Sequence, residues 1–271
     1  MDTNTNANTQ NNTSMYLTRH LQRIDDSGAL NTKMDKQWNQ SDSRELNYRI
    51  NPYLSDKAEQ DTNINNVVRN FEDIELDSMK NIDVIISSPY LRCLQTSIIL
   101  TRKINELKKD SGLELITQIH VNFGLGEFAD DIIFFGVEPP LDIKKVFDFS
   151  LCHLAKNGVG RDAFIVDSTN PEVMNWETEP EYYDRIKSTL NQIYQTYSGK
   201  NILVITHAQS GNIFINKNLA YTQVIKINTD LITNSITNLV GGNLKETLYY
   251  KEKYLKYKNK YIQLKKKSQI R

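Results

Sequence analysis

The strongest constraint on the fold comes from two nearly continuous apolar runs, "IDVII" at residues 82–86 and "NILVI" at residues 201–205. Such runs are typical of strands buried on both faces of a parallel sheet. Shorter β-rich runs occur at 14–18 and 115–121, and segments of helical period are predicted at 57–79, 91–109, 143–156 and 179–197. This alternation predicts an α/β fold, a three-layer α/β/α sandwich around a mostly parallel central sheet.

The chain is expected to hold one folded domain with an appendage at each end. Its 271 residues suit a single sizeable α/β domain, which we place at residues 14–242. Residues 1–13 are almost all Asn, Thr and Gln and are predicted to be disordered. Within the domain, residues 124–175 are interpreted as an insertion that caps the sheet edge, and "LITNSITNLVGGN" at 231–243 as a last strand.

Neither a membrane span nor a secretory signal is expected. No apolar run approaches the ~20 residues that cross a bilayer, and the first residues lack a basic segment followed by an apolar one. Two cysteines form no disulfide framework, and with no CxxC pair they offer no zinc knuckle. These features predict an intracellular, cytoplasmic protein.

Residues 243–271 are predicted to form a basic amphipathic helix. From Lys245 onward ten basic residues stand against two acidic ones, so the rest of this neutral chain carries about eight net negative charges. Tyrosines at three-four spacing line one face. Packing on its own domain and pairing with another chain, as in a homo-oligomer, are equally weighted interpretations; nucleic-acid or membrane-surface binding is the weaker third. The tail also looks similar to those of giant amoebal virus proteins, which would place the protein in a host cytoplasm.

Charged residues follow three of the predicted strands. Arg19 and His20 end the first, Ser88 and Arg92 follow the second, and His207 ends the third. The carboxyl ends of strands in an α/β sheet converge, so these side chains should meet and bind an anion with several oxygens. Ser88 is expected to cap the next helix, with Pro89 at its first position and Arg92 in its first turn, where free backbone N–H groups would attract the same phosphate.

A metal site and a nucleotide-binding loop are the alternatives. The histidines show no HxxxH or HxH pairing and have arginines beside them, which would repel a cation. No GxxxxGK[ST] phosphate loop occurs in the sequence. The pattern therefore favours a metal-free phosphoryl site.

Four motifs in this order resemble the histidine phosphatase superfamily, also called phosphoglycerate-mutase-like: "LTRHLQRID", "SSPYLRCLQTS", "GLGEF" and "VITHA". The resemblance spans about residues 15–211. Arg23 and the residues after it look closest to a phosphatase branch with RHGER-like sequences. This resemblance implies a phosphomonoester hydrolase, without a metal or other cofactor, that acts on a phosphorylated small molecule or a phosphoprotein.

The resemblance also implies a role for each motif residue. His20 would be the nucleophile that forms a phosphohistidine, and it must be neutral to attack; Arg19 beside it lowers its pKa. Glu127 would be the general acid and base, although nearby acids at 130, 131 and 138 compete for this role. The groups implied to bind the phosphoryl oxygens are Arg19, Arg92 and His207, with a further contact from Arg23. His120, His153 and Cys93 are interpreted as structural.

One residue departs from the family pattern beside the nucleophile. Leu21 stands where the family has Gly, and its Cβ would be strained if the position needs a positive φ. Its isobutyl group would also enter the space beside the phosphate. The alternative function is therefore an impaired phosphate-binding or scaffolding relative whose C-terminal helix recruits a partner.

Overall fold

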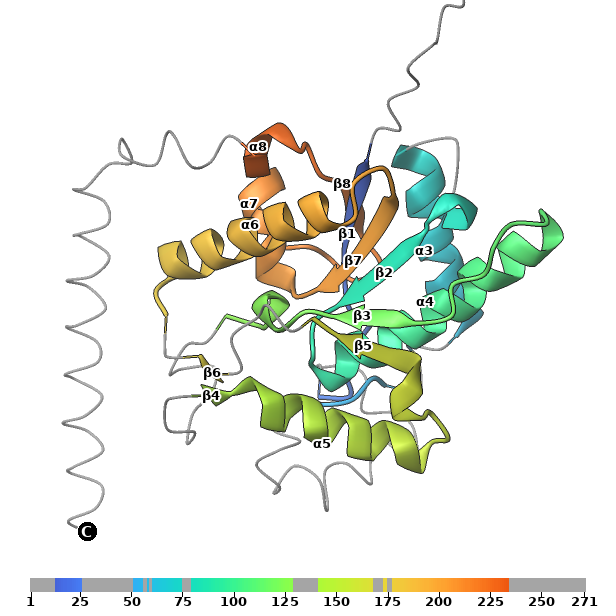
Figure 1. The fold of residues 1–271 in the computed structure, drawn as a ribbon, viewed down its shortest axis with the longest axis horizontal. Helices are drawn as coiled ribbons and strands as arrows, with labels where there is room; N and C mark the ends of the chain where they lie inside the picture. The colour runs from blue at the N-terminus through green and yellow to red at the C-terminus, as the bar shows by residue number, and fades with distance from the viewer. Residues whose placement is uncertain are drawn as a thin grey trace, which may run out of the picture. The chain divides into compact units, whose positions relative to one another are not determined.

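Six strands form one mixed sheet in the order β5-β3-β2-β7-β1-β8 (Figure 1). The computed structural model describes residues 13–25, 51–55, 58, 60–74, 79–128, 141–167, 173–174 and 177–233. The sheet strands are β1 (Ser14–Arg19), β2 (Val84–Ser87), β3 (Ile119–Val121), β5 (Phe164–Val166), β7 (Asn201–Thr206) and β8 (Val224–Lys226). All neighbours pair in parallel except β1 and β8, which are antiparallel. The sheet is therefore mostly parallel, as predicted.

Helices cover both faces of this sheet (Figure 1). The α-helices are α3 (Asp61–Ile74), α4 (Leu91–Asp110), α5 (Ile143–Lys156), α6 (Glu179–Thr196), α7 (Asn212–Ile215) and α8 (Asp230–Thr233). Short 3-10 helices are η2 (Met79–Asn81), η3 (Phe123–Leu125), η4 (Arg161–Ala163) and η5 (Ala208–Gly211), and a separate antiparallel pair joins β4 (Leu141–Asp142) to β6 (Val173–Met174). None of the helices described is both long and apolar enough to cross a bilayer.

Two hydrophobic cores lie on opposite faces of the sheet, because successive side chains of a strand point to opposite sides. In β7, Ile202 and Val204 join a core with α6, whereas Leu203 and Ile205 join a larger core with α3, α4 and α5. All four side chains are fully buried, and burying each contributes about 1.5–3 kcal/mol. This alternation confirms the predicted three-layer sandwich and explains why the run lacks polar residues.

Three strands of the sheet differ from the sequence prediction. The region from 124 to 175 was expected to cap the sheet edge, but it supplies the edge strand itself, since β5 pairs with β3. The predicted strand at 115–121 shortens to β3, and the Ile116 N–H donates instead to the Asn105 side chain at 2.8 Å. β8, which pairs with β1, was not predicted at all.

Predictions near the chain ends have mixed outcomes. The last strand expected at 231–243 is wrong at its start, where the backbone forms α8, and residues from 234 onward lie outside the described residues. The predicted helix at 243–271 and residues 1–12 also lie outside them; Thr13 accepts a hydrogen bond from the Gly199 N–H at 2.6 Å. The helix expected at 57–79 begins at Asp61.

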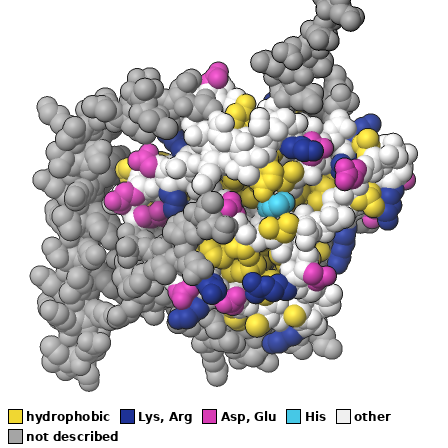
Figure 2. Space-filling view, in the orientation of Figure 1, with side chains coloured by type: hydrophobic (Ala, Val, Ile, Leu, Met, Phe, Trp, Pro, Cys, Tyr) yellow, Lys and Arg dark blue, Asp and Glu magenta, His cyan; other side chains and the backbone are white. Residues whose placement is uncertain are grey.

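Charge on the surface is mixed. On the face drawn in Figure 2, the described acidic and basic side chains are interspersed. No single-sign patch of described residues is seen on this face.

Candidate active site

The carboxyl ends of β1 and β7 bring the two predicted catalytic histidines together. Arg19 lies opposite Thr206 in the parallel ladder, and the His20 N–H continues it by donating to the Thr206 carbonyl at 3.0 Å. The ring centroids of His20 and His207 are 5.7 Å apart, edge to face, and each residue is only 1% exposed. Backbone pairing therefore sets the spacing of the two imidazoles, which confirms that these strand ends meet.

His20 is held as a neutral imidazole in one defined tautomer. Its Nδ1 lies 2.7 Å from the carbonyl oxygen of Leu21, which can only accept, so Nδ1 carries the proton and Nε2 the lone pair. Burial lowers the pKa of His20 well below its usual value, and the charge of Arg92 lowers it further, against the opposing effect of the Leu21 hydrogen bond. Arg19, the cause predicted from sequence, has a smaller effect.

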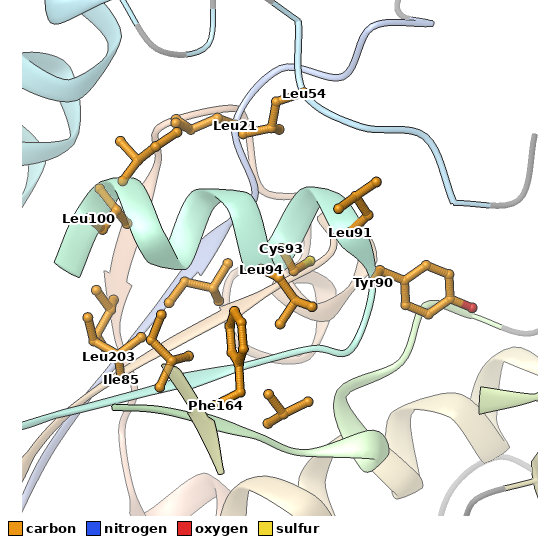
Figure 3. Close-up of a cluster of buried hydrophobic side chains, with 14 of the residues drawn as sticks. Leu21, Leu54, Ile85, Tyr90, Leu91, Cys93, Leu94, Leu100, Phe164 and Leu203 are labelled. Carbon is orange, nitrogen blue, oxygen red and sulfur yellow. The ribbon is translucent and has the colours of Figure 1, made fainter. Parts of the chain in front are cut away.

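Leu21 does not carry the backbone strain expected of it. Among the described residues other than glycine, positive φ angles occur only at Asn216 and Thr222. The Leu21 side chain is 1% exposed and belongs to the core that contains α4, and Figure 3 shows it beside Leu54. Its N–H donates to the Thr96 hydroxyl at 2.9 Å. Leu21 is therefore a core residue whose carbonyl orients His20.

Arg92 is the largest fully buried side chain of the described residues and sits in the first turn of α4, as predicted. Its Nη2 donates to a carboxylate oxygen of Glu127 and lies 3.3 Å from Nδ1 of His207. Its Nε and Nη1 are buried and make no hydrogen bond within the described part of the chain. Leaving such donors unsatisfied is costly, so this guanidinium is arranged to receive an acceptor that a ligand would bring.

The helix start differs from the prediction in a way that matters for anion binding. The N-cap of α4 is Tyr90 rather than Ser88, and it makes no side-chain cap. The N–H groups of Cys93 and Leu94 both donate to the Tyr90 carbonyl, and the Leu91 N–H donates to the Asn51 side chain at 2.7 Å. Most N–H groups of the first turn are thus occupied, so the guanidinium of Arg92, rather than the helix backbone, is the group that attracts an anion.

Ser88 forms a hydrogen bond with His207 and does not cap α4. Its Oγ lies 2.9 Å from Nε2 of His207. Because Arg92 can only donate, Nδ1 of His207 must accept, so Nε2 carries the proton and donates to Ser88. Burial lowers the pKa of His207 well below its usual value, and Arg92 and then His20 lower it further. Both histidines are therefore neutral, with opposite tautomers.

Glu127 reaches the same cluster from the loop after η3. Its second carboxylate oxygen lies 3.7 Å from Nδ1 of His207, and its side chain is 17% exposed, against none for Arg92. The carboxyl group is thus at the border between the buried cations and solvent. The competing acids at 130, 131 and 138 lie outside the described residues.

Arg19 approaches the histidines through an aromatic partner. Its guanidinium lies 3.7 Å from the ring centroid of Tyr221, and its Nη1 is 3.4 Å from the Leu219 carbonyl. The Tyr221 ring is in turn 5.9 Å from the His20 ring. Thr222, next in sequence, has the left-handed φ of 64°, and its carbonyl accepts from Asn70 at 2.6 Å. A strained turn, fixed from α3, therefore presents Tyr221 to Arg19 and His20.

Arg23 lies at the outer side of the site. It forms an isolated antiparallel bridge with Leu54, and its Nε pairs with Asp25 at 3.0 Å. Its charge lowers the pKa of both His20 and His207. The site residues predicted from sequence therefore lie around one cluster, and Arg23 is linked to both histidines by its charge.

Sequence reasoning missed several residues around this cluster. Tyr221 and Arg185 carry no motif that marks them, and Ser88 was assigned to the helix cap. Arg185 lies on α6 and bonds to the loop that carries Glu127. The sequence does carry one local signal in that region, the capping box formed by Thr178 and Glu181, which predicts the start of α6. Glu177, the ion-pair partner of Arg185, comes immediately before it.

The three residues interpreted as structural have the expected surroundings. His120 pairs with the Tyr197 hydroxyl at 2.8 Å, and the His153 ring stacks on Tyr53 with centroids 5.3 Å apart. Burial raises the pKa of the Cys93 thiol to about 12, so it remains a neutral core residue although its sulfur lies 3.8 Å from His207.

Comparisons with known proteins add only distant likenesses. No family model and no curated protein sequence matches the chain. The solved structure of the ecdysone phosphate phosphatase from Bombix mori, in complex with tungstate, is similar at 17% identity and a TM-score of 0.44, over 73% of each chain. Bacillus stearothermophilus YhfR is similar at 16% identity and a TM-score of 0.37, over 78% of this chain and 83% of that one. At TM-scores below 0.5, neither likeness carries an argument about function. The function is therefore inferred from the contacts of the site itself.

Proposed function

We propose that this site hydrolyses phosphate monoesters through a phosphohistidine formed on Nε2 of His20, without a metal or other cofactor. The observation that carries the proposal is the tautomer of His20. A carbonyl holds the proton on Nδ1, so the lone pair of Nε2 is available in a buried site beside the guanidinium of Arg92. A neutral imidazole in this state is a nucleophile for phosphorus.

Arg92 and Arg19 would form the binding site for the phosphoryl group. Nε and Nη1 of Arg92 are buried donors without a partner among the described residues, and they would bind two phosphoryl oxygens. Arg19, ordered by Tyr221, would bind from the β1 side. Charge that develops on these oxygens in the transition state is stabilised by donors already in place, an effect worth about 10²–10³-fold in rate per donor.

In the first step, Nε2 of His20 attacks phosphorus as the bond to the ester oxygen breaks. Glu127 binds Arg92 through a carboxylate oxygen in the free site, so this step requires that it carries a proton once the substrate is bound. It gives that proton to the ester oxygen, so the leaving group departs as a neutral alcohol. The phosphorylated ring is then cationic, because Nδ1 keeps its proton. The Leu21 carbonyl that accepts from Nδ1 stabilises this charge.

In the second step, water attacks phosphorus and the bond to Nε2 breaks. The carboxylate of Glu127 accepts the proton of the water, and inorganic phosphate leaves. His20 recovers its neutral tautomer and Glu127 its proton, so atoms and charge balance over the cycle.

His207 contributes by orienting the other groups. Its Nδ1 accepts from Arg92 and its Nε2 donates to Ser88, so both ring nitrogens are engaged. An arriving phosphate dianion would offset the cations that lower the pKa of His207. The substrate itself would be a phosphorylated small molecule or a phosphoprotein.

Phosphate release from an aryl phosphate in the presence of a chelator tests this proposal. We expect turnover in the wild type and none with His20→Ala, while His153→Ala, which removes a histidine outside the site, keeps it. Rapid quench of the wild type should trap an acid-labile, alkali-stable phosphoenzyme. Unchanged turnover with His20→Ala would contradict the nucleophile assignment.

The alternative function, phosphate binding without chemistry, rested on an obstructing Leu21. The core position and unstrained backbone of Leu21 support the catalytic proposal over this alternative. Calorimetric titration with vanadate beside the assay separates the two functions. Binding without wild-type turnover, with turnover restored by Leu21→Gly, would establish the binding protein instead.

A further inference from the structure

We propose that Arg185, held by Glu177, is the positioning residue that places Glu127 for proton transfer; this inference rests on the proposed function. Arg185 comes from α6, on the face of the sheet opposite α4. Its guanidinium reaches the stretch Gly124 to Glu127 at the carboxyl end of the sheet. It makes no described contact with either histidine.

The hydrogen bonds of Arg185 account for every donor that it has. Nη1 donates to the carbonyls of Gly124 at 2.6 Å and Gly126 at 3.2 Å, and Nη2 donates to the backbone carbonyl of Glu127 at 3.3 Å. Nε and Nη2 also bind the two carboxylate oxygens of Glu177 at 2.9 Å and 2.5 Å. A guanidinium has five N–H donors. None is left for a substrate, which distinguishes Arg185 from Arg92.

Burial makes these bonds strong and specific. The Arg185 and Glu177 side chains are 15% and 10% exposed, and the bidentate pair fixes the plane of the guanidinium. That plane then meets three carbonyls of one short loop. A lysine could keep the charge but not this planar fork.

Phe123 and Leu125 are buried, and Asn122 caps η3 by accepting from the Gly124 N–H at 3.0 Å. These contacts do not engage the loop carbonyls, which Arg185 binds. Two residues of the loop, Gly124 and Gly126, carry no side chain that could pack. The loop also approaches α6 very closely, since a Cβ built on Gly124 would overlap the Oγ1 of Thr189. Contact at Thr189 and hydrogen bonds at Arg185, one helical turn apart, therefore seat the backbone from which the Glu127 carboxyl extends.

Leaving-group dependence tests a positioning role, because a misplaced acid matters most when the leaving oxygen needs a proton. We expect Arg185→Met to lower kcat with an alkyl phosphate by about 100-fold, the cost of a misplaced catalytic group. Departure of nitrophenolate from a nitrophenyl ester needs no such proton, so the phosphorylation burst with this ester should persist. Its steady-state turnover should still fall, because hydrolysis of the phosphoenzyme needs Glu127 as the base for water. The dissociation constant for vanadate should change by less than about twofold, since Arg92 and Arg19 are untouched.

Glu177→Gln, which keeps the size of the side chain, should show the same pattern more weakly, and Arg102→Met, an exposed arginine of α4, should show no change. Equal losses on both esters together with weaker vanadate binding would indicate a general structural defect and overturn the inference. So would wild-type kinetics in Arg185→Met.

An activity-independent measurement keeps this inference separate from the proposed function. Hydrogen exchange at the Leu125 and Gly126 amides, which close η3 by donating to Asn122 and Phe123, should accelerate in Arg185→Met and not in Arg102→Met. Unchanged exchange refutes the clamp. A wild type without turnover refutes the proposed function, whatever the exchange shows.

Discussion

Two parts of the site are held in place by different means. His20 and His207 extend from β1 and β7, and the parallel ladder between those strands fixes their spacing. Glu127 and Tyr221 lie on loops, and side chains from neighbouring helices, Arg185 and Asn70, hold the loop carbonyls. The positions of the two histidines should therefore survive most side-chain substitutions around them. The positions of Glu127 and Tyr221 depend instead on single side chains that are distant in the sequence.

The largest expected effect is on stability and concerns the strand-held part. Leu21→Gly removes a fully buried leucine, and loss of its packing and added backbone freedom should lower the free energy of unfolding by about 3–5 kcal/mol. Urea denaturation measures this. Because the Leu21 side chain packs in the core that contains α4, turnover of the folded fraction should not rise. A gain in turnover would show that the side chain does block the phosphate.

Arg92→Lys should have the next largest effect, now on catalysis. A lysine cannot supply both Nε and Nη1 donors, so kcat/KM for an aryl phosphate should fall by about 10²–10³-fold, or about 3–4 kcal/mol. Steady-state kinetics and vanadate titration measure the loss, with Arg102→Lys as the matched control. A loss below tenfold would mean that Arg92 is mainly a structural partner of Glu127.

Acid should weaken the fold through the two buried histidines. Their pKa values are lowered in the folded state, so below the ordinary value of 6.5 the unfolded chain binds more protons and stability falls with pH. Each histidine contributes up to about 1.4 kcal/mol per pH unit in the window between its folded and unfolded pKa.

His20→Gln should therefore flatten the pH dependence of the urea midpoint just below pH 6.5, whereas His153→Gln, made outside the site, should not. An equally steep profile in both variants would contradict the burial of a neutral His20. The same lowered pKa keeps the nucleophile unprotonated in mildly acidic solution, so turnover should not be lost there through His20.

The smallest expected effect tests the loop-held part. Tyr221→Leu removes the ring that stacks on Arg19, which should raise KM by about fivefold, or about 1 kcal/mol, while kcat changes less. Tyr221→Phe keeps the ring and serves as the control. Equal losses in the two variants would assign the effect to the hydroxyl group rather than to the stacking.

The sequence predicted the strand-held part well because its signals are local. The apolar runs identified β2 and β7, and the polar residues that follow β1, β2 and β7 do meet at one edge. The partners of those residues were harder to predict. Ser88 had a familiar explanation as a helix cap, yet the helix starts two residues later and Ser88 binds His207.

By itself, the sequence determined the layered α/β architecture and the set of charged groups at the strand ends, because the period of apolar residues and the direction of parallel strands are enough to place them. The histidine tautomers, the burial of Leu21 and the clamp of Arg185 could be read only from the folded chain. The His20 tautomer depends on how the backbone turns the carbonyl of the next residue, Leu21, toward the ring. The other features depend on partners that lie far away in the chain.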